Sequence, residues 1–356
     1  MKVEEKIIWQ QAGGDVARNY VRTNIEFDVI LNGPGYAGPL PDCEKRLKVD
    51  GCSAKKITDL KRFAEEMKDG DIVVLRLGTS EVYAVGEVVG DYIWMEEFGD
   101  IDGWDLQHVR RVRWLWTAVG EPQKFDVHAL KMGDTTQRLL DGTVRSWLEG
   151  LSIPEPAYRR PLAILPVGTH KEASLEEISE YLYDQGVSSQ SIQHLLAEIG
   201  ELIRIAKWYA RRNEQPSEHE TVSYLAIPLL RALGWTPQRM AIEWNQVDVA
   251  LFDKLPRIDS NLAVVVEAKR RNNSCLTALS QAQTYAETRP KCKRLIVSDG
   301  IRYGVYARGA EGFSLNAYLN LTRLCDAYPV YRCAGAKNAL LMMTPEWSPG
   351  EIRDLR

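Results

Sequence analysis

Three charged residues within two apolar runs constrain the fold of this chain more than any other feature. Asp248 lies inside the run Val-Asp-Val-Ala-Leu-Phe at 247–252. Glu267 and Lys269 close the run Leu-Ala-Val-Val-Val-Glu-Ala-Lys at 262–269. Runs rich in β-branched residues are typical of buried strands. A charge in such a strand is costly unless it is paired or binds a metal ion, so the two runs predict a functional site.

The spacing of these residues predicts that they meet. Glu267 and Lys269 are two residues apart and therefore share one face of a strand. The connection 253–261 is short enough for a hairpin, which would bring Asp248 beside them. Two carboxylates beside an amine suit a hard cation such as Mg2+, completed by water and substrate phosphate. The alternative is a surface salt bridge between Glu267 and Lys269, because a D…E-x-K pattern alone matches many unrelated strands.

The elements expected around the two runs indicate an α/β domain. A helix is expected over 217–232, because Leu233-Gly234 is a typical C-terminal stop signal. The further elements expected in order are two strands, a helix and a strand, at 246–252, 262–268, 275–287 and 294–298.

Motifs in this region resemble those of one nuclease family. Ser217-Glu-His-Glu-Thr and the later Pro-Leu-Leu-Arg-Ala-Leu-Gly-Trp235 resemble the opening helix of the nuclease domain in type I restriction R subunits. Asp248 and Glu267-Ala-Lys269 fall where that family has its D and E-x-K. The run Gln281-Ala-Gln-Thr-Tyr285 matches the Q-x-x-x-Y helix of RecB-like nucleases. Residues 214–310 therefore resemble a PD-(D/E)xK restriction-endonuclease-like domain.

The resemblance implies a catalytic set of six residues: Asp248, Glu267, Lys269, Glu218, Gln281 and Tyr285. Asp248 and Glu267 would bind Mg2+, for which Mn2+ is a possible substitute. Lys269 would be the catalytic lysine, orienting or deprotonating water or stabilising charge. Glu218 would support the metal or the water, with Glu220 as a less favoured rival. Gln281 and Tyr285 would contact the substrate.

Residues 1–120 are expected to be mostly β-structure with few helices. A hairpin is expected from 70–78 and 82–89, a third strand at 109–116 and a helix at 56–68. These runs resemble the PUA-like superfamily of small β-barrels, in particular EVE domains, which are related to YTH and ASCH domains. The resemblance is looser than that of the nuclease region.

Domains of this superfamily commonly bind a modified base that is flipped out of its strand. Such binding requires an apolar slot with aromatic walls. Asp28 is a weaker polar candidate, and for each aromatic residue the alternative is core packing. The candidates for the modified-base pocket are Trp9, Asn32, Tyr36, Tyr92, Trp94 and Trp104.

Between the two domains, residues 121–187 are expected to form a connector, with a short helix around 136–148. Ser174-Leu-Glu-Glu177 predicts a helix start through a capping box. A longer helix is expected over 188–212, with apolar residues at heptad-like spacing. This helix would either pack on its own domain or form a dimer seam. The expected domains are a reader at 1–120, the connector, and a helical lead-in with the nuclease at 188–356.

Composition limits the function further. The chain has 356 residues, a net charge of −4 and six scattered cysteines, which favours a reducing cytoplasm. No run of about 18 apolar residues occurs, so no membrane association is expected. The chain has no G-x-x-x-x-G-K-S/T loop, so no ATP-driven motor is expected.

The resulting hypothesis is a modification-dependent DNA endonuclease. It would bind double-stranded DNA carrying modified bases, with modified cytosine such as 5-methylcytosine as the expected base. Double-strand cutting needs two active sites, so a homodimer is expected. The alternatives are an RNA-directed or repair nuclease with a PUA-like domain that reads RNA or structure, and a non-enzymatic binding protein.

Overall fold

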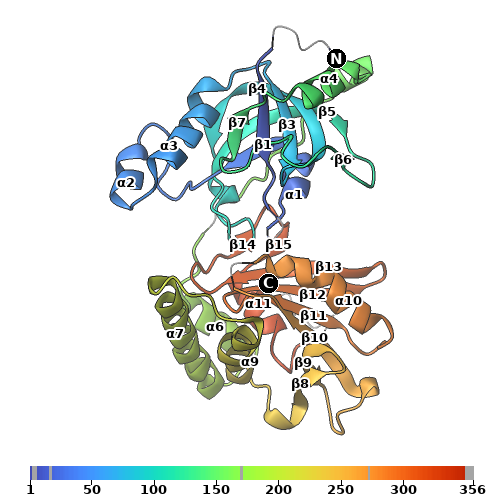
Figure 1. The fold of residues 1–356 in the computed structure, drawn as a ribbon. Coiled ribbons are helices and arrows are strands. Elements are labelled where there is room, and N and C mark those ends of the chain that lie inside the picture. Colours follow the sequence, from blue (N-terminus) through green and yellow to red (C-terminus); the bar gives the residue numbers. More distant parts are fainter. Residues whose placement is uncertain (2–5, 16–17, 169–170, 272, 349–356) are drawn as a thin grey trace. The chain divides into compact units, whose positions relative to one another are not determined.

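The computed structural model of the chain describes residues 1–356 except 2–5, 16–17, 169–170, 272 and 349–356. The chain divides into two compact units, Met1–Val167 and Gly168–Arg356. Each unit combines helices with a β-sheet of its own (Figure 1). The coarse prediction of a mixed α and β chain with two domains agrees with this division. In the described part of the chain, no helix has both the length and the apolar character needed to cross a membrane.

The first unit is built on a curled seven-stranded sheet (Figure 1). Its strands are β1 (Ile8–Ala12), β2 (Val29–Asn32), β3 (Ile72–Leu77), β4 (Glu81–Trp94), β5 (His108–Thr117), β6 (Gln123–Lys124) and β7 (Thr136–Arg138). The order is β2-β5-β4-β3-β1-β7, and β6 pairs with β4. The expected hairpin is confirmed, because β3 and β4 pair antiparallel. The end strands β2 and β7 are linked by side chains, since Asn32 Nδ2 donates to Thr136 Oγ1 at 3.1 Å.

Both faces of this sheet are covered. Neighbouring residues of a strand point to opposite faces, and both Ile8 and Trp9 are buried, in separate apolar clusters. The expected helix at 56–68 is present as α3 followed by the π-helical turn η1. The helical elements of the unit are α1 (Val21–Glu26), α2 (Glu44–Val49), α3 (Ala54–Lys61), η1 (Arg62–Glu66), η2 (Glu96–Phe98), α4 (Gly142–Gly150) and α5 (Glu155–Arg159).

The segment 121–187, expected as a connector, is divided between the units at Val167/Gly168. Its first part belongs to the first unit, because Val144 and Leu148 of α4 share an apolar cluster with Ile8. The helix expected around 136–148 begins later, after β7, at the cap Asp141, whose Oδ1 accepts from Val144 N at 3.0 Å. Residues 136–138, expected at the start of this helix, form β7 instead and pair with β1.

The second unit has an eight-stranded sheet, ordered β14-β15-β13-β12-β11-β10-β9-β8 (Figure 1). Its strands are β8 (Met240–Trp244), β9 (Val247–Phe252), β10 (Leu262–Ala268), β11 (Arg294–Ser298), β12 (Arg302–Gly309), β13 (Gly312–Asn320), β14 (Ala327–Tyr328) and β15 (Cys333–Ala334). The strands expected at 246–252, 262–268 and 294–298 are present. β9 and β10 pair antiparallel, as a hairpin requires, and β10 pairs parallel with β11.

The helical elements of the second unit are α6 (Leu175–Asp184), α7 (Ser189–Arg211), α8 (Glu218–Thr221), η3 (Val222–Ala226), α9 (Ile227–Ala232), η4 (Pro237–Arg239), η5 (Asp259–Asn261), η6 (Cys275–Ala278), α10 (Leu279–Glu287) and α11 (Ala336–Met342). The capping box of Ser174 and Glu177 is present at α6. The helix expected at 217–232 contains the π-helical turn η3. Pro228 follows this turn and has no N–H to donate to the preceding turn, which favours the wider turn there.

The apolar stripe of α7 packs inside its own unit. Ile192, Leu195 and Ile199 are buried in one cluster with residues of α6, α9 and the sheet. This burial exists within a single chain, so the stripe is not available as a dimer seam. The seam alternative for 188–212 is therefore wrong, and the packing alternative holds.

Candidate functional site

Asp248 and Glu267 lie together on the hairpin of β9 and β10. Val249 pairs with Val266, so the next residues outward are Asp248 and Glu267. Asp248 N lies 3.4 Å from Glu267 Oε1, and Asp248 Oδ2 accepts from Ala268 N at 2.7 Å. The structure thus brings together the two carboxylates that the sequence assigned to one site.

Glu267 is a fully buried carboxyl group in an unusual environment. Burial first, and then the nearby Asp248 carboxylate, raise the pKa of Glu267 to about 8, and Lys269 opposes this only in part. Its Oε2 atom is buried without a hydrogen-bond partner. Buried polar atoms are normally paired, so this oxygen marks a position where a cation or donor would be stabilised.

Lys269, directly after β10, contacts helix α10. Its Nζ donates to Gln281 Oε1 at 2.9 Å, and Gln281 Nε2 lies 3.4 Å from the Tyr285 hydroxyl. Gln281 and Tyr285 are neighbours on one face of α10 because they are four residues apart. Backbone pairing fixes the lysine, since Lys269 N donates to Ser298 O at 2.7 Å.

Glu218 completes the group, and its neighbour Glu220 does not. Glu218 Oε1 lies 3.8 Å from Lys269 Nζ. Glu220 instead closes the capping box of α8: its carboxylate accepts from Ser217 N at 2.7 Å, and Ser217 Oγ accepts from Glu220 N at 3.2 Å. These hydrogen bonds lower the pKa of Glu220. The preference for Glu218 therefore agrees with the geometry.

The donor set can be tested against a divalent cation. Within the part of the chain that the structure describes, no three His, Cys, Asp or Glu side chains form a metal-holding group. Two carboxylates with one unpartnered, buried oxygen nevertheless suit Mg2+, which usually takes few protein ligands and keeps several waters. Asp248 and Glu267 are the residues that would hold it.

A second candidate site is a pocket of about 480 Å³ in the first unit. Its walls come from segments far apart in the sequence, including the ends of β1 and β3 and the loop before β5. Prominent lining residues are Ala12, Tyr20, Pro34, Lys56, Arg76 and Trp104.

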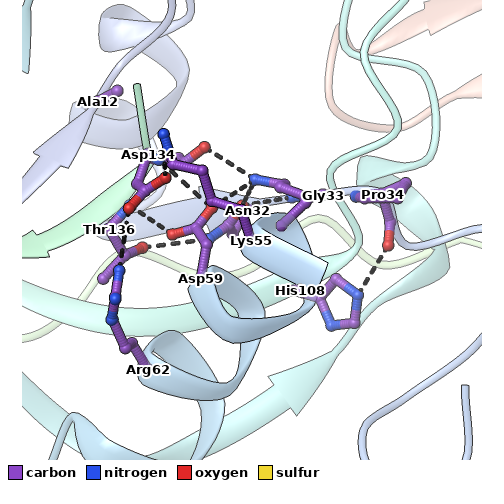
Figure 2. Close-up of polar contacts among 12 residues, drawn as sticks. Ala12, Asn32, Gly33, Pro34, Lys55, Asp59, Arg62, His108, Asp134 and Thr136 are labelled. Atoms are coloured by element: carbon purple, nitrogen blue, oxygen red, sulfur yellow. Dashed lines mark hydrogen bonds and ion pairs between the residues drawn. The ribbon is translucent and has the colours of Figure 1, made fainter. Parts of the chain in front are cut away.

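A polar network supports this pocket (Figure 2). Lys56 Nζ donates to Asn32 Oδ1 at 2.8 Å, Asp59 Oδ2 at 2.6 Å and Thr135 Oγ1 at 2.9 Å. The buried Asp59 also accepts from Thr136 N at 2.8 Å. Three acceptors use all three hydrogens of the ammonium, so Lys56 is held in place and is not free to bind a ligand directly.

Trp104 is the one aromatic candidate that lines the pocket. The Arg18 guanidinium lies 5.0 Å from the centre of its ring. Trp104 Nε1 and Arg76 Nε are buried without a hydrogen-bond partner. Both of these groups are donors on residues that line the pocket.

Asn32 and Trp9 serve the fold rather than the pocket lining. Asn32 is buried in the network, where its Oδ1 also accepts from Gly33 N at 2.8 Å. Trp9 is fully buried in the core, and its Nε1 donates to Asp71 Oδ2 at 2.8 Å. Trp9 therefore packs in the core, as the alternative for each aromatic candidate has it. Its side chain lies on the face of β1 that the helices cover.

The other aromatic candidates have partners elsewhere in the unit. The Tyr92 hydroxyl contacts His108 Nδ1 at 2.7 Å. Trp94 Nε1 donates to Gly35 O at 2.9 Å, and the exposed Tyr36 donates to Asp50 at 3.0 Å. Asp28 is buried and accepts from Ala163 N at 2.7 Å. None of these four residues lines the pocket, because each is committed to a strand end or loop of its own.

Sequence reasoning missed Lys56 and Arg76. Arg76 carried the same signal as Asp248, because it is a charge inside an apolar strand run, at 72–77. Lys56 carried no such signal, since lysine is ordinary on a helix surface. Its role depends on Asn32 and Thr135, which are distant in the sequence.

Comparison with known proteins gives one match. Residues 41–138 match a family described as Domain of unknown function (DUF8426). The match lies within the first unit and includes Lys56, Arg76 and Trp104. No curated protein and no solved structure matches the chain.

Proposed function

We propose that this chain is a Mg2+-dependent endonuclease that cleaves DNA carrying modified bases. The single observation that carries the proposal is the buried Glu267, with an unpartnered oxygen, beside Asp248. The charges of Lys269 and Glu218 act on Glu267, and Lys269 contacts Gln281, which in turn contacts Tyr285. A group of this composition suits phosphodiester hydrolysis, in line with the resemblance to PD-(D/E)xK nucleases.

Asp248 and Glu267 would hold the cation at the end of the hairpin. When bound, Mg2+ supplies the charge that lowers the pKa of a bound water and stabilises the developing phosphorane. Lys269 would orient or deprotonate the attacking water, or stabilise negative charge on the phosphate. The bond from Lys269 to Gln281 holds the ammonium in place, and Tyr285 in turn contacts Gln281.

The first unit would supply selectivity for the modified base. Stacking on Trp104 would offset part of the cost of removing a base from its strand. The unpartnered donors of Trp104 and Arg76 would bind acceptor atoms on the base edge. Modified cytosine remains the proposed base, and a homodimer remains the proposed assembly for cutting both strands.

Cleavage of matched plasmids tests this function. Plasmids with cytosine, 5-methylcytosine or 5-hydroxymethylcytosine are incubated with the protein and Mg2+ or EDTA. We expect Mg2+-dependent cutting that prefers a modified plasmid. Lys269→Ala should abolish cutting, with a loss of at least about 100-fold, and keep binding nearly intact.

Other outcomes of the same assay contradict the proposal. Equal cutting of all three plasmids would remove selectivity for modification. Cutting of RNA without cutting of DNA would favour the RNA-directed alternative. Retained binding without hydrolysis of any substrate would favour a non-enzymatic binding protein.

A further inference from the structure

An exposed tryptophan lies at the C-terminal end of α7. Trp208 is 45% exposed, although a tryptophan usually buries most of its surface. The Arg212 guanidinium lies 5.0 Å from the centre of its ring, one helical turn further along. Tyr209 contacts it edge-on, with ring centroids 5.0 Å apart. The indole is therefore held by neighbours and still presents a large apolar surface.

This end of α7 is fastened to both segments that carry the candidate nuclease residues. Tyr209 lies beside Glu220 of α8, and burial followed by this carboxylate raises the pKa of the tyrosine. Arg271, two residues after Lys269, donates from Nη1 to Ala206 O at 2.5 Å. Arg270 Nε donates to Pro216 O at 3.3 Å. These contacts attach the C-terminal end of α7 to the segments that carry Glu218 and Lys269.

Exposed basic residues flank Trp208 in the sequence. They are Lys207, Arg211 and Arg212, and Arg270 is a further exposed cation, bonded to Pro216. The nearby acids have partners of their own: Glu201 pairs with Arg204, Glu214 with Arg212 at 2.9 Å, Glu218 lies 3.8 Å from Lys269 Nζ, and Glu220 is bonded in its capping box. Cations at a helix C-terminus are common because they interact well with the helix dipole. That explanation does not account for a tryptophan left exposed among them.

We propose that Trp208 and Arg212 form a platform that stacks an unpaired nucleotide of the substrate strand beside the cleaved phosphate. Aromatic faces among cations suit single-stranded nucleic acid, because bases stack on the rings and phosphates contact the basic groups. The inference rests on the proposed nuclease function and adds that the substrate is partly unpaired at the cleavage site.

Binding without cleavage tests the platform. The full chain carrying Glu267→Gln is titrated in EDTA against a labelled single strand of about 20 nucleotides and its matched duplex, and fluorescence anisotropy is measured. Trp208→Ala should weaken single-strand binding about 10-fold, and Trp208→Phe should retain most of it. Tyr183→Ala is the matched control, because Tyr183 is a 60% exposed aromatic residue on α6.

Three results would overturn the platform. The first is that Trp208→Ala binds the single strand as tightly as the chain with Glu267→Gln alone. The second is that it binds no more weakly than the Tyr183→Ala control, and the third is that it weakens single-strand and duplex binding equally. Arg212→Ala provides a second variant, expected to lower the salt dependence of binding, should Trp208→Ala fail to fold. Because this assay needs no hydrolysis, a wild-type chain that cleaves nothing refutes the nuclease and leaves the platform to be judged separately.

Discussion

At the scale of single residues, buried polar groups without partners mark both candidate sites. Such groups are Glu267 Oε2 in the second unit and Trp104 Nε1 and Arg76 Nε in the first. Each costs about 1–3 kcal/mol relative to a satisfied group. A ligand that supplies the missing partner recovers that free energy. Glu267 needs a cation or donor and the other two need acceptors, so the two sites differ in the chemistry they can bind.

A buried histidine gives a pH-dependent prediction at this scale. His108 is fully buried, with Nε2 3.0 Å from Pro34 O and Nδ1 2.7 Å from the Tyr92 hydroxyl. Pro34 O can only accept, so Nε2 carries the hydrogen, and in the neutral ring Nδ1 accepts from the Tyr92 hydroxyl. Burial is the main cause that lowers the pKa of His108 to about 4.

This shift predicts acid sensitivity. Below a pH of about 6.5 the unfolded histidine binds a proton that the folded one excludes down to about 4, so stability falls across this window. The loss is of the order of 3 kcal/mol at the acid end. His108→Gln should reduce this dependence in urea unfolding measured between pH 7.5 and 4. Parallel stability profiles for the two proteins would contradict the assignment.

At the scale of elements, the sequence predicted those helix starts and hairpins that depend on residues close together in the chain. The capping box of Ser174 and the β3–β4 hairpin are fixed by neighbouring residues, and both are present. Strand β8 was missed because it pairs only with β9 and carries Glu243 at φ 53°, a conformation that sequence patterns do not show. Strands β14 and β15 were missed for a similar reason, since each has two residues and is defined by tertiary pairing.

The two candidate sites differed in how well the sequence predicted them. The candidate nuclease residues follow motifs whose spacing fixes which strand and helix faces meet. Asp248 contacts Glu267, Lys269 contacts Gln281 and Glu218, and the charges of Lys269 and Glu218 act on Glu267. The pocket aromatics were chosen by residue type, which does not distinguish a wall from a core. Trp9 and Trp104 were both candidates by residue type, and the structure separates them, because Trp9 is fully buried in the core and Trp104 lines the pocket.

Two glycines offer an element-scale test of packing at the end of β11. Gly300 has φ 86°, and an added Cβ would lie 2.7 Å from Leu225 Cβ in the π-helical turn η3. Gly312 has φ 113° with no atom within 4 Å of such a Cβ. Gly300→Ala should therefore cost about 2–4 kcal/mol of unfolding free energy, and Gly312→Ala about 1 kcal/mol. If the two variants lost the same free energy of unfolding in urea, the close packing of Gly300 on η3 would not contribute to the cost of Gly300→Ala.

At the scale of the whole molecule, the candidate sites lie in separate units. The pocket around Trp104 belongs to Met1–Val167, and the group around Lys269 belongs to Gly168–Arg356. Each unit has its own sheet and apolar clusters, so a substitution in one core need not disturb the other. The division of labour that we propose, with selection in one unit and hydrolysis in the other, would correspond to these two units.

This division predicts that selectivity can be removed while hydrolysis is kept. Trp104→Ala deletes the aromatic wall of the pocket, so cleavage of modified DNA should fall about 10–100-fold toward the rate on plain DNA. The rate on plain DNA should stay unchanged, because Asp248, Glu267 and Lys269 are untouched. Tyr36→Ala is the matched control, since Tyr36 is 44% exposed in the same unit and does not line the pocket. Two results would contradict this prediction. In Trp104→Ala, the cleavage rates on modified and plain DNA could fall by the same factor, or Tyr36→Ala could lose the preference for modified DNA as well. Either result would place selectivity elsewhere in the chain.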